Sequence, residues 1–241
     1  MDMKRRSFLT AAATGAGVFA IGSGNSALAA VPEGRPFAKL PLKISCSYNW
    51  LKDSLPRDSS PVEIFELADK WGFPAVEHLR AGEDRRNYDK YVEATEKTGV
   101  KWSCIMGAGR ITQGEMLDLE EHDRLEAQCR EAIEQAKGLG CERIVGLTGE
   151  TSAKRTISYD KRAQNVIKFL RRIKGLMEES GIVMVLETLN RLRDHQNFWL
   201  HKTDQAQLVV LAVDSPNVKQ LYDIYHQQID EGNLIPNIRD N

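Results

Sequence analysis

The sequence has 241 residues, of which 41% are hydrophobic and 28% are charged. This is the composition of a globular chain long enough for one large core. With 33 basic and 34 acidic side chains the net charge is -1, so no basic excess points to nucleic acid as a partner. No two of the four cysteines form a C-x-x-C pair, which excludes zinc-ribbon and redox motifs and leaves any disulfide pairing open.

The N-terminus has the three-part layout of a bacterial signal peptide. Positive residues at 4–6 precede an apolar, Ala/Gly-rich stretch, and small residues follow at 26–30. The apolar stretch is too short for a stable transmembrane helix, although an uncleaved anchor is the alternative. The pair Arg5 and Arg6, followed by Ser-Phe-Leu, resembles the twin-arginine signal. We expect a signal peptide over 1–29, a linker over 30–41, one domain over 42–241, and export to the periplasm with membrane contact only during transport.

Strand-like and helix-like segments alternate through the rest of the chain. Strands are predicted to start near residues 43, 75, 100, 143, 182 and 218. Helices are predicted over 62–71, 88–98, 119–139, 160–180 and 203–213. The first four helices end at a glycine, namely Gly72, Gly99, Gly140 and Gly181. This alternation predicts an α/β fold with parallel strands, either a barrel or an open doubly wound sheet.

Two features favour the (β/α)₈ barrel. No Gly-x-Gly-x-x-Gly follows the first strand, so the main sign of a dinucleotide-binding sheet is missing. Polar residues also follow the C-terminal ends of several strands, which is where barrels build their sites. A complete barrel takes roughly 250 residues. Residues 42–241 contain about six βα units, so we expect strands seven and eight to be missing.

Two apolar runs that end in polar residues are predicted to carry the chemistry, residues 182–190 and 218–226. Each run reads as a buried strand with a carboxylate near its C-terminal end, Glu187 in the first and Asp223 in the second. A buried carboxylate is costly unless it is paired or binds a metal ion. Because side chains alternate along a strand, Glu187 shares a face with Val183 and Val185. Two inward carboxylates predict a site for Mg²⁺ or Mn²⁺, and a structural buried pair is the alternative.

Five short segments in this half of the chain resemble the hydroxypyruvate isomerase family of xylose-isomerase-like TIM barrels. They are Leu-Glu-Thr-Leu-Asn at 186–190, Thr-Asp-Gln-Ala at 203–206, Ser-Pro-Asn-Val-Lys at 215–219, Tyr-Asp-Ile-Tyr-His at 222–226 and Glu-Gly-Asn-Leu at 231–234. The resemblance is specific over 182–234. It is looser over 42–150, where Phe-Pro-Ala-Val-Glu at 73–77 matches the second-strand pattern.

The resemblance implies an activity and a role for each residue. The activity is metal-dependent isomerisation or epimerisation of small hydroxy-carbonyl compounds or sugars, such as hydroxypyruvate to tartronate semialdehyde, through an ene-diolate. Glu187 and Asp223 match metal ligands, and Glu187 is also the proton-transfer base. His226 matches a histidine that faces the substrate, and Asn190 matches the Asn of a Glu-x-x-Asn pattern, a substrate-binding position. A strand-seven ligand and a strand-eight glutamate have no counterpart in these 241 residues.

Two other interpretations stay open. The chain could be a non-catalytic, truncated barrel that pairs with a second copy, because six units leave two open sheet edges. It could also be a phosphodiester-cleaving relative of the same barrel class, which the neutral charge disfavours. For the 241-residue chain we expect weak metal affinity and little isomerisation. Asn190 could instead cap the loop after its strand, and His195 in that loop could line the pocket.

Overall fold

The computed structural model describes residues 35–150 and 157–240. The predicted signal peptide over 1–29 lies outside these residues, so export stays a prediction. The predicted linker is described from Arg35 onward, where the 3-10 helix η1 (Pro36–Lys39) packs on the domain: Phe37 stacks on Phe73 with ring centroids 4.3 Å apart. In the described ranges no helix is both long and apolar enough to span a bilayer.

Six strand positions lie side by side, and every pair is parallel. The first sheet contains β1 (Ser45–Ser47), β2 (Ala75–Glu77) and β3 (Lys101–Trp102), and the second contains β4 (Ile105–Met106), β5 (Arg143–Gly146), β6 (Val183–Glu187) and β7 (Val218–Leu221). The one strand predicted near residue 100 is broken into β3 and β4 at Ser103 and Cys104. Both halves stay beside the β2 segment, because Ser103 N donates to Val76 O and Met106 N donates to Leu79 O.

The spatial order of the strands follows their order in the chain, with no reversal. A doubly wound sheet reverses its strand order at a switch point, whereas a barrel adds each strand beside the last. The α/β barrel prediction is therefore confirmed over a doubly wound sheet. The described residues fill six strand positions, and β1 and β7 each pair with a single neighbour there.

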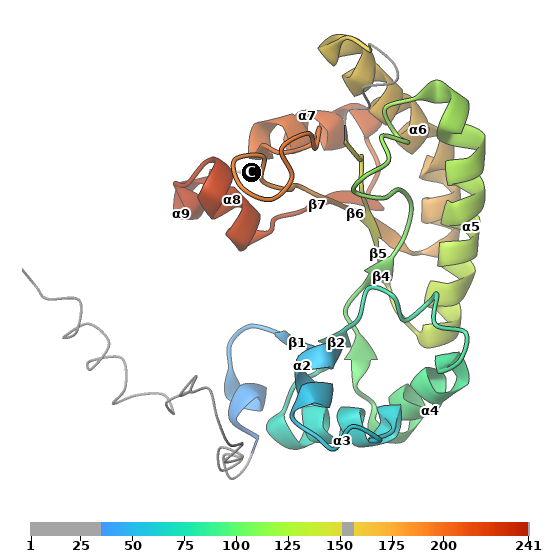
Figure 1. Ribbon diagram of the computed structural model, residues 1–241, viewed down its shortest axis with the longest axis vertical. Coiled ribbons are helices and arrows are strands. Elements are labelled where there is room, and N and C mark those ends of the chain that lie inside the picture. Colours follow the sequence, from blue (N-terminus) through green and yellow to red (C-terminus); the bar gives the residue numbers. More distant parts are fainter. Residues whose placement is uncertain (1–34, 151–156, 241) are drawn as a thin grey trace, which may run out of the picture. The chain divides into compact units, whose positions relative to one another are not determined.

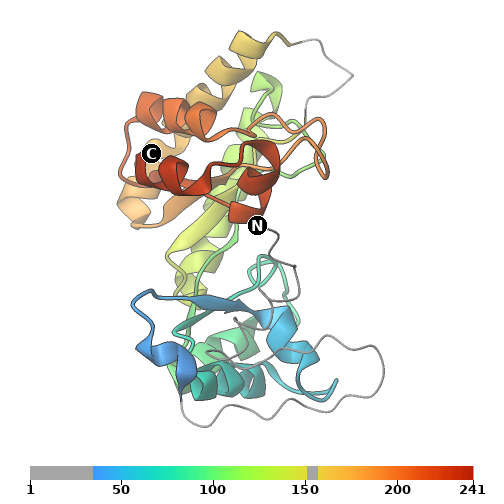
Figure 2. The same cartoon turned by 90° about the vertical axis from the view of Figure 1, so that its left-hand side faces the viewer.

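The predicted helices are present, with bounds close to those expected. They are α3 (Pro61–Trp71), α4 (Tyr88–Thr98), α5 (His122–Leu139), α6 (Tyr159–Ser180) and α7 (Thr203–Val213). Shorter helices are α2 (Tyr48–Asp53), η2 (Leu119–Glu121), α8 (Ile224–Asp230) and α9 (Leu234–Asp240). Figures 1 and 2 show α2 and α3 at one end of the row of strands and α7, α8 and α9 at the other.

Local sequence sets the ends of these helices. Ser60 and Glu63 form a capping box at the start of α3, with Pro61 in the first helical position. All four predicted glycines are C-caps with positive φ, for example 87° at Gly72. An added Cβ at Gly72 would lie 2.7 Å from the backbone nitrogen of Ala38 in η1, so glycine also lets that segment approach.

The burial of alternate residues in β6 indicates which face of the sheet Glu187 lies on. Met184 and Leu186 are fully buried, and Val185 between them keeps 9% of its surface exposed. Since side chains alternate, Met184 and Leu186 face one side of the sheet, while Val185 and Glu187 face the other. The lower burial of Val183 and Glu187 at the two ends of the strand agrees with the predicted shared face.

Two predicted strands are shorter in the structure. The run 42–48 forms only β1, because Tyr48 begins α2, where Tyr48 and Leu51, three residues apart, are the buried side chains. The run 218–226 forms β7 only as far as Leu221, and Asp223 then caps α8. The prediction that Asp223 is held on a strand face was wrong. A helix cap positions this carboxylate instead.

Candidate metal and substrate site

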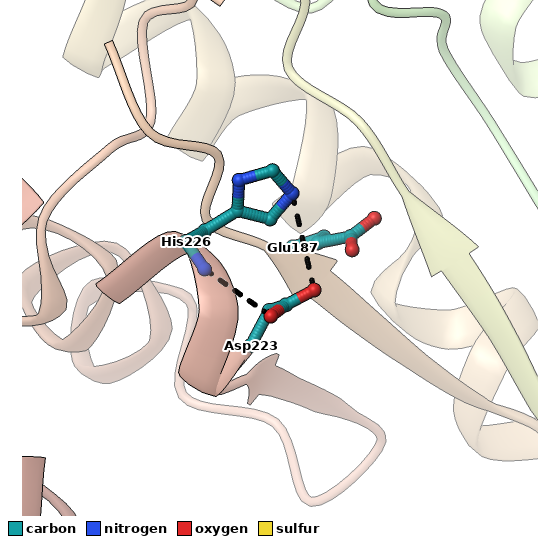
Figure 3. A group of neighbouring side chains, drawn as sticks. All are labelled: Glu187, Asp223 and His226. Atoms are coloured by element: carbon teal, nitrogen blue, oxygen red, sulfur yellow. Dashed lines mark hydrogen bonds and ion pairs between the residues drawn. The ribbon is translucent and has the colours of Figure 1, made fainter. Parts of the chain in front are cut away.

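Glu187, Asp223 and His226 come together at the C-terminal ends of β6 and β7. Glu187 is the last residue of β6, and the other two lie at the start of α8, as Figure 3 shows. One potential ligand atom from each lies within 4.8 Å of the others. Among residues 35–150 and 157–240 this is the one group of three or more His, Cys, Asp or Glu side chains close enough to share a metal ion.

Asp223 uses its two carboxylate oxygens differently. Oδ1 accepts hydrogen bonds from the backbone N–H groups of Tyr225 (2.8 Å) and His226 (3.3 Å), which is the contact of a helix N-cap. Oδ2 lies 3.9 Å from Nε2 of His226, too far for a hydrogen bond. The cap therefore fixes the carboxylate and leaves one oxygen available to a ligand.

The protonation of His226 follows from its contact with Asn190. Nδ1 of His226 lies 3.2 Å from the backbone nitrogen of Asn190 and 2.7 Å from its side-chain nitrogen. A backbone N–H can only donate, so Nδ1 is the acceptor and the ring proton sits on Nε2. Burial lowers the pKa of His226, partly opposed by Asp223, so the ring is neutral near pH 7.

This tautomer distinguishes His226 from the two carboxylates. Its Nε2–H faces the group as a donor, which suits a substrate oxygen rather than a cation. Binding a metal through Nε2 would move the proton to Nδ1 and leave the N–H of Asn190 without its acceptor. The geometry thus agrees with the predicted substrate-facing role of His226.

Glu187 is a half-buried carboxylate with no hydrogen bond or ion pair to any described residue. Burial raises its pKa to about 7, and the negative charges of Asp223 and Glu77 act in the same direction. Uncompensated carboxylates in such a place are stabilised by a bound cation. The oxygen donors of Glu187 and Asp223 fit a hard divalent ion such as Mg²⁺ or Mn²⁺.

Asn190 was predicted to bind substrate, but the structure gives its side chain other partners. The residue is fully buried. Its Oδ1 accepts from the backbone N–H groups of Arg193 and Asp194, and its Nδ2 donates to Asp194 and contacts His226. Both ends of the amide are therefore occupied, and Asn190 caps the loop and orients His226 instead of facing a ligand.

Replacing Asn190 with alanine is expected to destabilise the protein by about 2–4 kcal/mol, because several buried hydrogen bonds are lost together. Urea denaturation measures this change. The matched control is Asn197→Ala in the same loop, where the side chain is exposed and has no partner among the described residues. That control should change stability by less than about 0.5 kcal/mol. Equal stability of the two variants would contradict the buried network.

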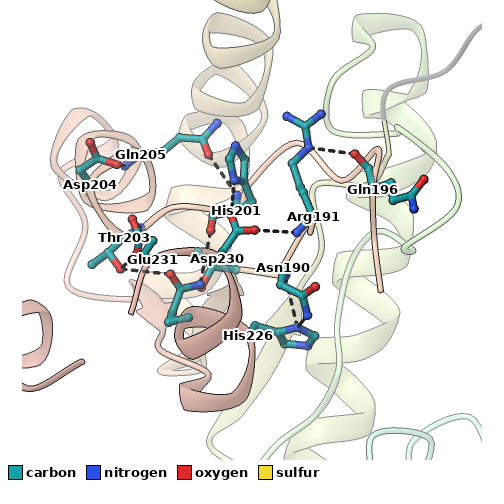
Figure 4. A network of polar contacts seen from close by, with 12 residues as sticks. Asn190, Arg191, Gln196, His201, Thr203, Asp204, Gln205, His226, Asp230 and Glu231 are labelled. Carbon is teal, nitrogen blue, oxygen red and sulfur yellow. Dashed lines mark hydrogen bonds and ion pairs between the residues drawn. The ribbon is translucent and has the colours of Figure 1, made fainter. Parts of the chain in front are cut away.

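Buried polar contacts hold α8 against the loop after β6. Nε2 of Gln227 donates to the hydroxyl of Thr188 at 2.7 Å, and both residues are fully buried. The hydroxyl and backbone N–H of Thr203 donate to Glu231, just after α8 (Figure 4). These contacts fix the helix that carries His226 relative to the strand that carries Glu187.

Three further side chains near the group were not predicted as site residues. Glu77 ends β2, and its negative charge is among the causes that raise the pKa of Glu187. His78 follows it and stacks on Tyr48 with ring centroids 5.2 Å apart. The ring of His195 lies 5.4 Å from that of His226. The available signal for Glu77 was its position at a strand end, the same signal that identified Glu187.

Comparison with known proteins agrees with this architecture. The family model described as a xylose isomerase-like TIM barrel matches residues 65–240. The chain belongs to the xylose isomerase-like TIM barrel family. Mouse and human relatives named as candidate hydroxypyruvate isomerases are each 31% identical over 208 residues, which cover 83% of this chain and 73% of the relative. A zebrafish relative with the same name is 29% identical over 206 residues, covering 83% and 72%.

Two solved structures have a similar fold. A family 2 AP endonuclease from Brucella melitensis has a TM-score of 0.67 at 20% identity, covering 81% of this chain and 74% of its own. The 3-keto-D-glucoside 4-epimerase from E. coli has a TM-score of 0.63 at 21% identity, covering 83% and 75%. At such identities the likeness concerns the fold alone, because one fold carries many activities. The predicted barrel, incomplete in the described residues, is thereby confirmed.

Proposed function

We propose that this chain is a metal-dependent isomerase or epimerase of small hydroxy-carbonyl compounds, with interconversion of hydroxypyruvate and tartronate semialdehyde as the leading reaction. The names of the mouse, human and zebrafish relatives support this reaction. The observation that carries the proposal is the unpartnered Glu187 carboxylate, with its pKa near 7, beside Asp223 and the Nε2–H of His226. Isomerisation needs a base of this kind next to a donor that holds a substrate oxygen.

The proton chemistry uses Glu187 and His226. Ionised Glu187 removes a proton from the hydroxymethyl carbon of hydroxypyruvate, and the electron pair moves toward the carbonyl to give an ene-diolate. Return of a proton to the former carbonyl carbon, together with transfer of the hydroxyl proton from the oxygen of the hydroxymethyl carbon to the former carbonyl oxygen, yields tartronate semialdehyde. The atoms and electrons then balance without an oxidant or reductant. His226 donates its Nε2–H to a substrate oxygen and holds the reacting carbons near Glu187. A base with a pKa near the working pH suits this step.

Glu187 and the free oxygen of Asp223 are the groups that would hold a divalent cation. When bound, such an ion supplies positive charge that polarises the substrate carbonyl. Two carboxylates are a small ligand set, and the family resemblance expects two more ligands from later strands. We therefore expect this chain to bind Mn²⁺ with a Kd on the order of 10⁻⁴–10⁻³ M, as weak oxygen-ligand sites do.

Proton removal can be tested separately from the complete reaction. With the 241-residue chain and Mn²⁺ in D₂O, hydroxypyruvate should lose its hydroxymethyl protons faster than in protein-free Mn²⁺ solution, as followed by proton NMR. A chelator should abolish the acceleration. Complete conversion is expected to be slow, because the resemblance assigns proton return to a strand-eight glutamate. No acceleration at saturating Mn²⁺ would contradict the proposal.

A nuclease function makes a different prediction. An abasic DNA duplex should stay intact with the same protein and metal, because the net charge of -1 offers no excess of cations for the phosphate backbone. Metal-dependent cleavage, lost in the Glu187→Gln variant, would favour the nuclease class instead.

A further inference from the structure

His201 and Asp230 form a buried pair at the opposite end of α8 from Asp223. Their side chains are 16% and 3% exposed. One oxygen of Asp230 accepts from Nδ1 of His201 at 2.5 Å, and the other accepts the backbone N–H of Arg191 at 2.9 Å (Figure 4). Both carboxylate oxygens are thus occupied, and the carboxylate fixes the Nδ1 proton and the ring orientation of His201.

The second ring nitrogen of His201 is left without a partner in the part of the chain that the structure describes. In the neutral ring Nε2 carries a lone pair and accepts a hydrogen bond. His201 lines a pocket of about 310 Å³, at the lower end of the range for small-molecule sites. The other lining residues are Arg191, Leu192, Gln196, Lys202 and Asp230.

The residues that line this pocket carry more positive than negative charge. Nε of Arg191 donates to the backbone oxygen of Gln196 at 2.9 Å, which orients the guanidinium and leaves its terminal nitrogens without a described partner. The Lys202 side chain is exposed and has no described partner either. Asp230 is the single acidic residue in the lining, and its oxygens are already satisfied.

We propose that this pocket binds free hydrogen phosphate. Arg191 and Lys202 would meet its charged oxygens, and its remaining O–H would donate to Nε2 of His201. Guanidinium and ammonium groups form strong, charge-assisted contacts with phosphate. In the neutral ring, the lone pair of Nε2 provides the selectivity, because sulfate has a similar size and charge but no O–H at neutral pH. The site does not depend on the reaction proposed above.

Isothermal titration with inorganic phosphate tests this assignment. The 241-residue chain is used at constant ionic strength near pH 8, with a chelator present so that no metal at Glu187 contributes. We expect saturable phosphate binding, with sulfate and acetate each about tenfold weaker, the effect of one lost hydrogen bond to a charged group. Lys202→Gln should weaken phosphate binding about tenfold, and Glu187→Gln should leave it unchanged.

Lys90→Gln on α4 is the matched control, because Lys90 is also an exposed lysine without a described partner. It should bind phosphate like the unmodified protein. Absence of saturable binding, or equal weakening by Lys202→Gln and Lys90→Gln, would overturn the proposed site. Equal binding of sulfate and phosphate would overturn the hydrogen bond to Nε2 of His201.

Discussion

Replacing Glu187 with glutamine is expected to reduce metal-dependent proton removal from hydroxypyruvate by at least about 100-fold, the usual contribution of a general base. Glutamine keeps the size of the side chain but has no basic carboxylate. Exchange of the hydroxymethyl protons in D₂O reports this step directly, whether or not the proton is returned to the neighbouring carbon. The variant should also leave the Nε2–H of His226 in place, since Asn190 orients that ring.

The control for this variant is Glu96→Gln, an exposed position on α4. Its exchange rate should match that of the unmodified protein. His226→Gln should give an intermediate loss, because it removes a substrate contact and not the base. An exchange rate in Glu187→Gln equal to that in Glu96→Gln would show that another group removes the proton.

The same Glu187→Gln substitution is expected to change stability in a pH-dependent way. Burial and neighbouring negative charge raise the pKa of folded Glu187 from its usual 4.5 to about 7. The folded state therefore holds a proton that the unfolded state has lost between these values, and stability falls as pH rises through this window. Above pH 7 the whole penalty is present, about 3 kcal/mol at 1.36 kcal/mol per unit of pKa.

Glutamine carries no charge at any of these pH values and does not suffer this penalty. Glu187→Gln should thus stabilise the metal-free protein by about 2–3 kcal/mol more at about pH 8.5 than at about pH 5. Urea denaturation at both pH values, with a chelator, measures the difference between variant and unmodified protein. The contributions of the other titrating groups are common to both proteins and largely cancel. The same stability change at both pH values would contradict the raised pKa of Glu187.

Much of the fold could be predicted from local pattern. The helices α4 and α7 have the predicted bounds, because the spacing of their apolar residues and the residues at their ends are local features of the sequence. Glu187 was predicted correctly as the end of a strand, since the run before it has branched apolar residues on both faces. The helix ends could be predicted at glycines, because the last position needs a left-handed backbone that glycine adopts easily.

The local pattern was insufficient where tertiary contacts decide the outcome. The run 218–226 is apolar enough for a strand or a helix, and the hydrogen bonds that Asp223 accepts decide for a helix from Ile224. The buried role of Asn190 depends on a histidine 36 residues later. The pair of His201 and Asp230 is separated by 29 residues and leaves no periodic trace in the sequence.

The central claim is that Glu187 and Asp223 together hold a divalent cation. A titration with Mn²⁺ near pH 8, followed by its electron paramagnetic resonance signal, tests it on the unmodified chain and on Glu187→Gln and Asp223→Asn. Asparagine keeps the helix cap, so Asp223→Asn removes a ligand charge without removing the N-cap. Asp58→Asn, at an exposed loop position, is the control. We predict one Mn²⁺ site that is lost in both site variants and kept in the control; Mn²⁺ binding that survives in either site variant would contradict the claim.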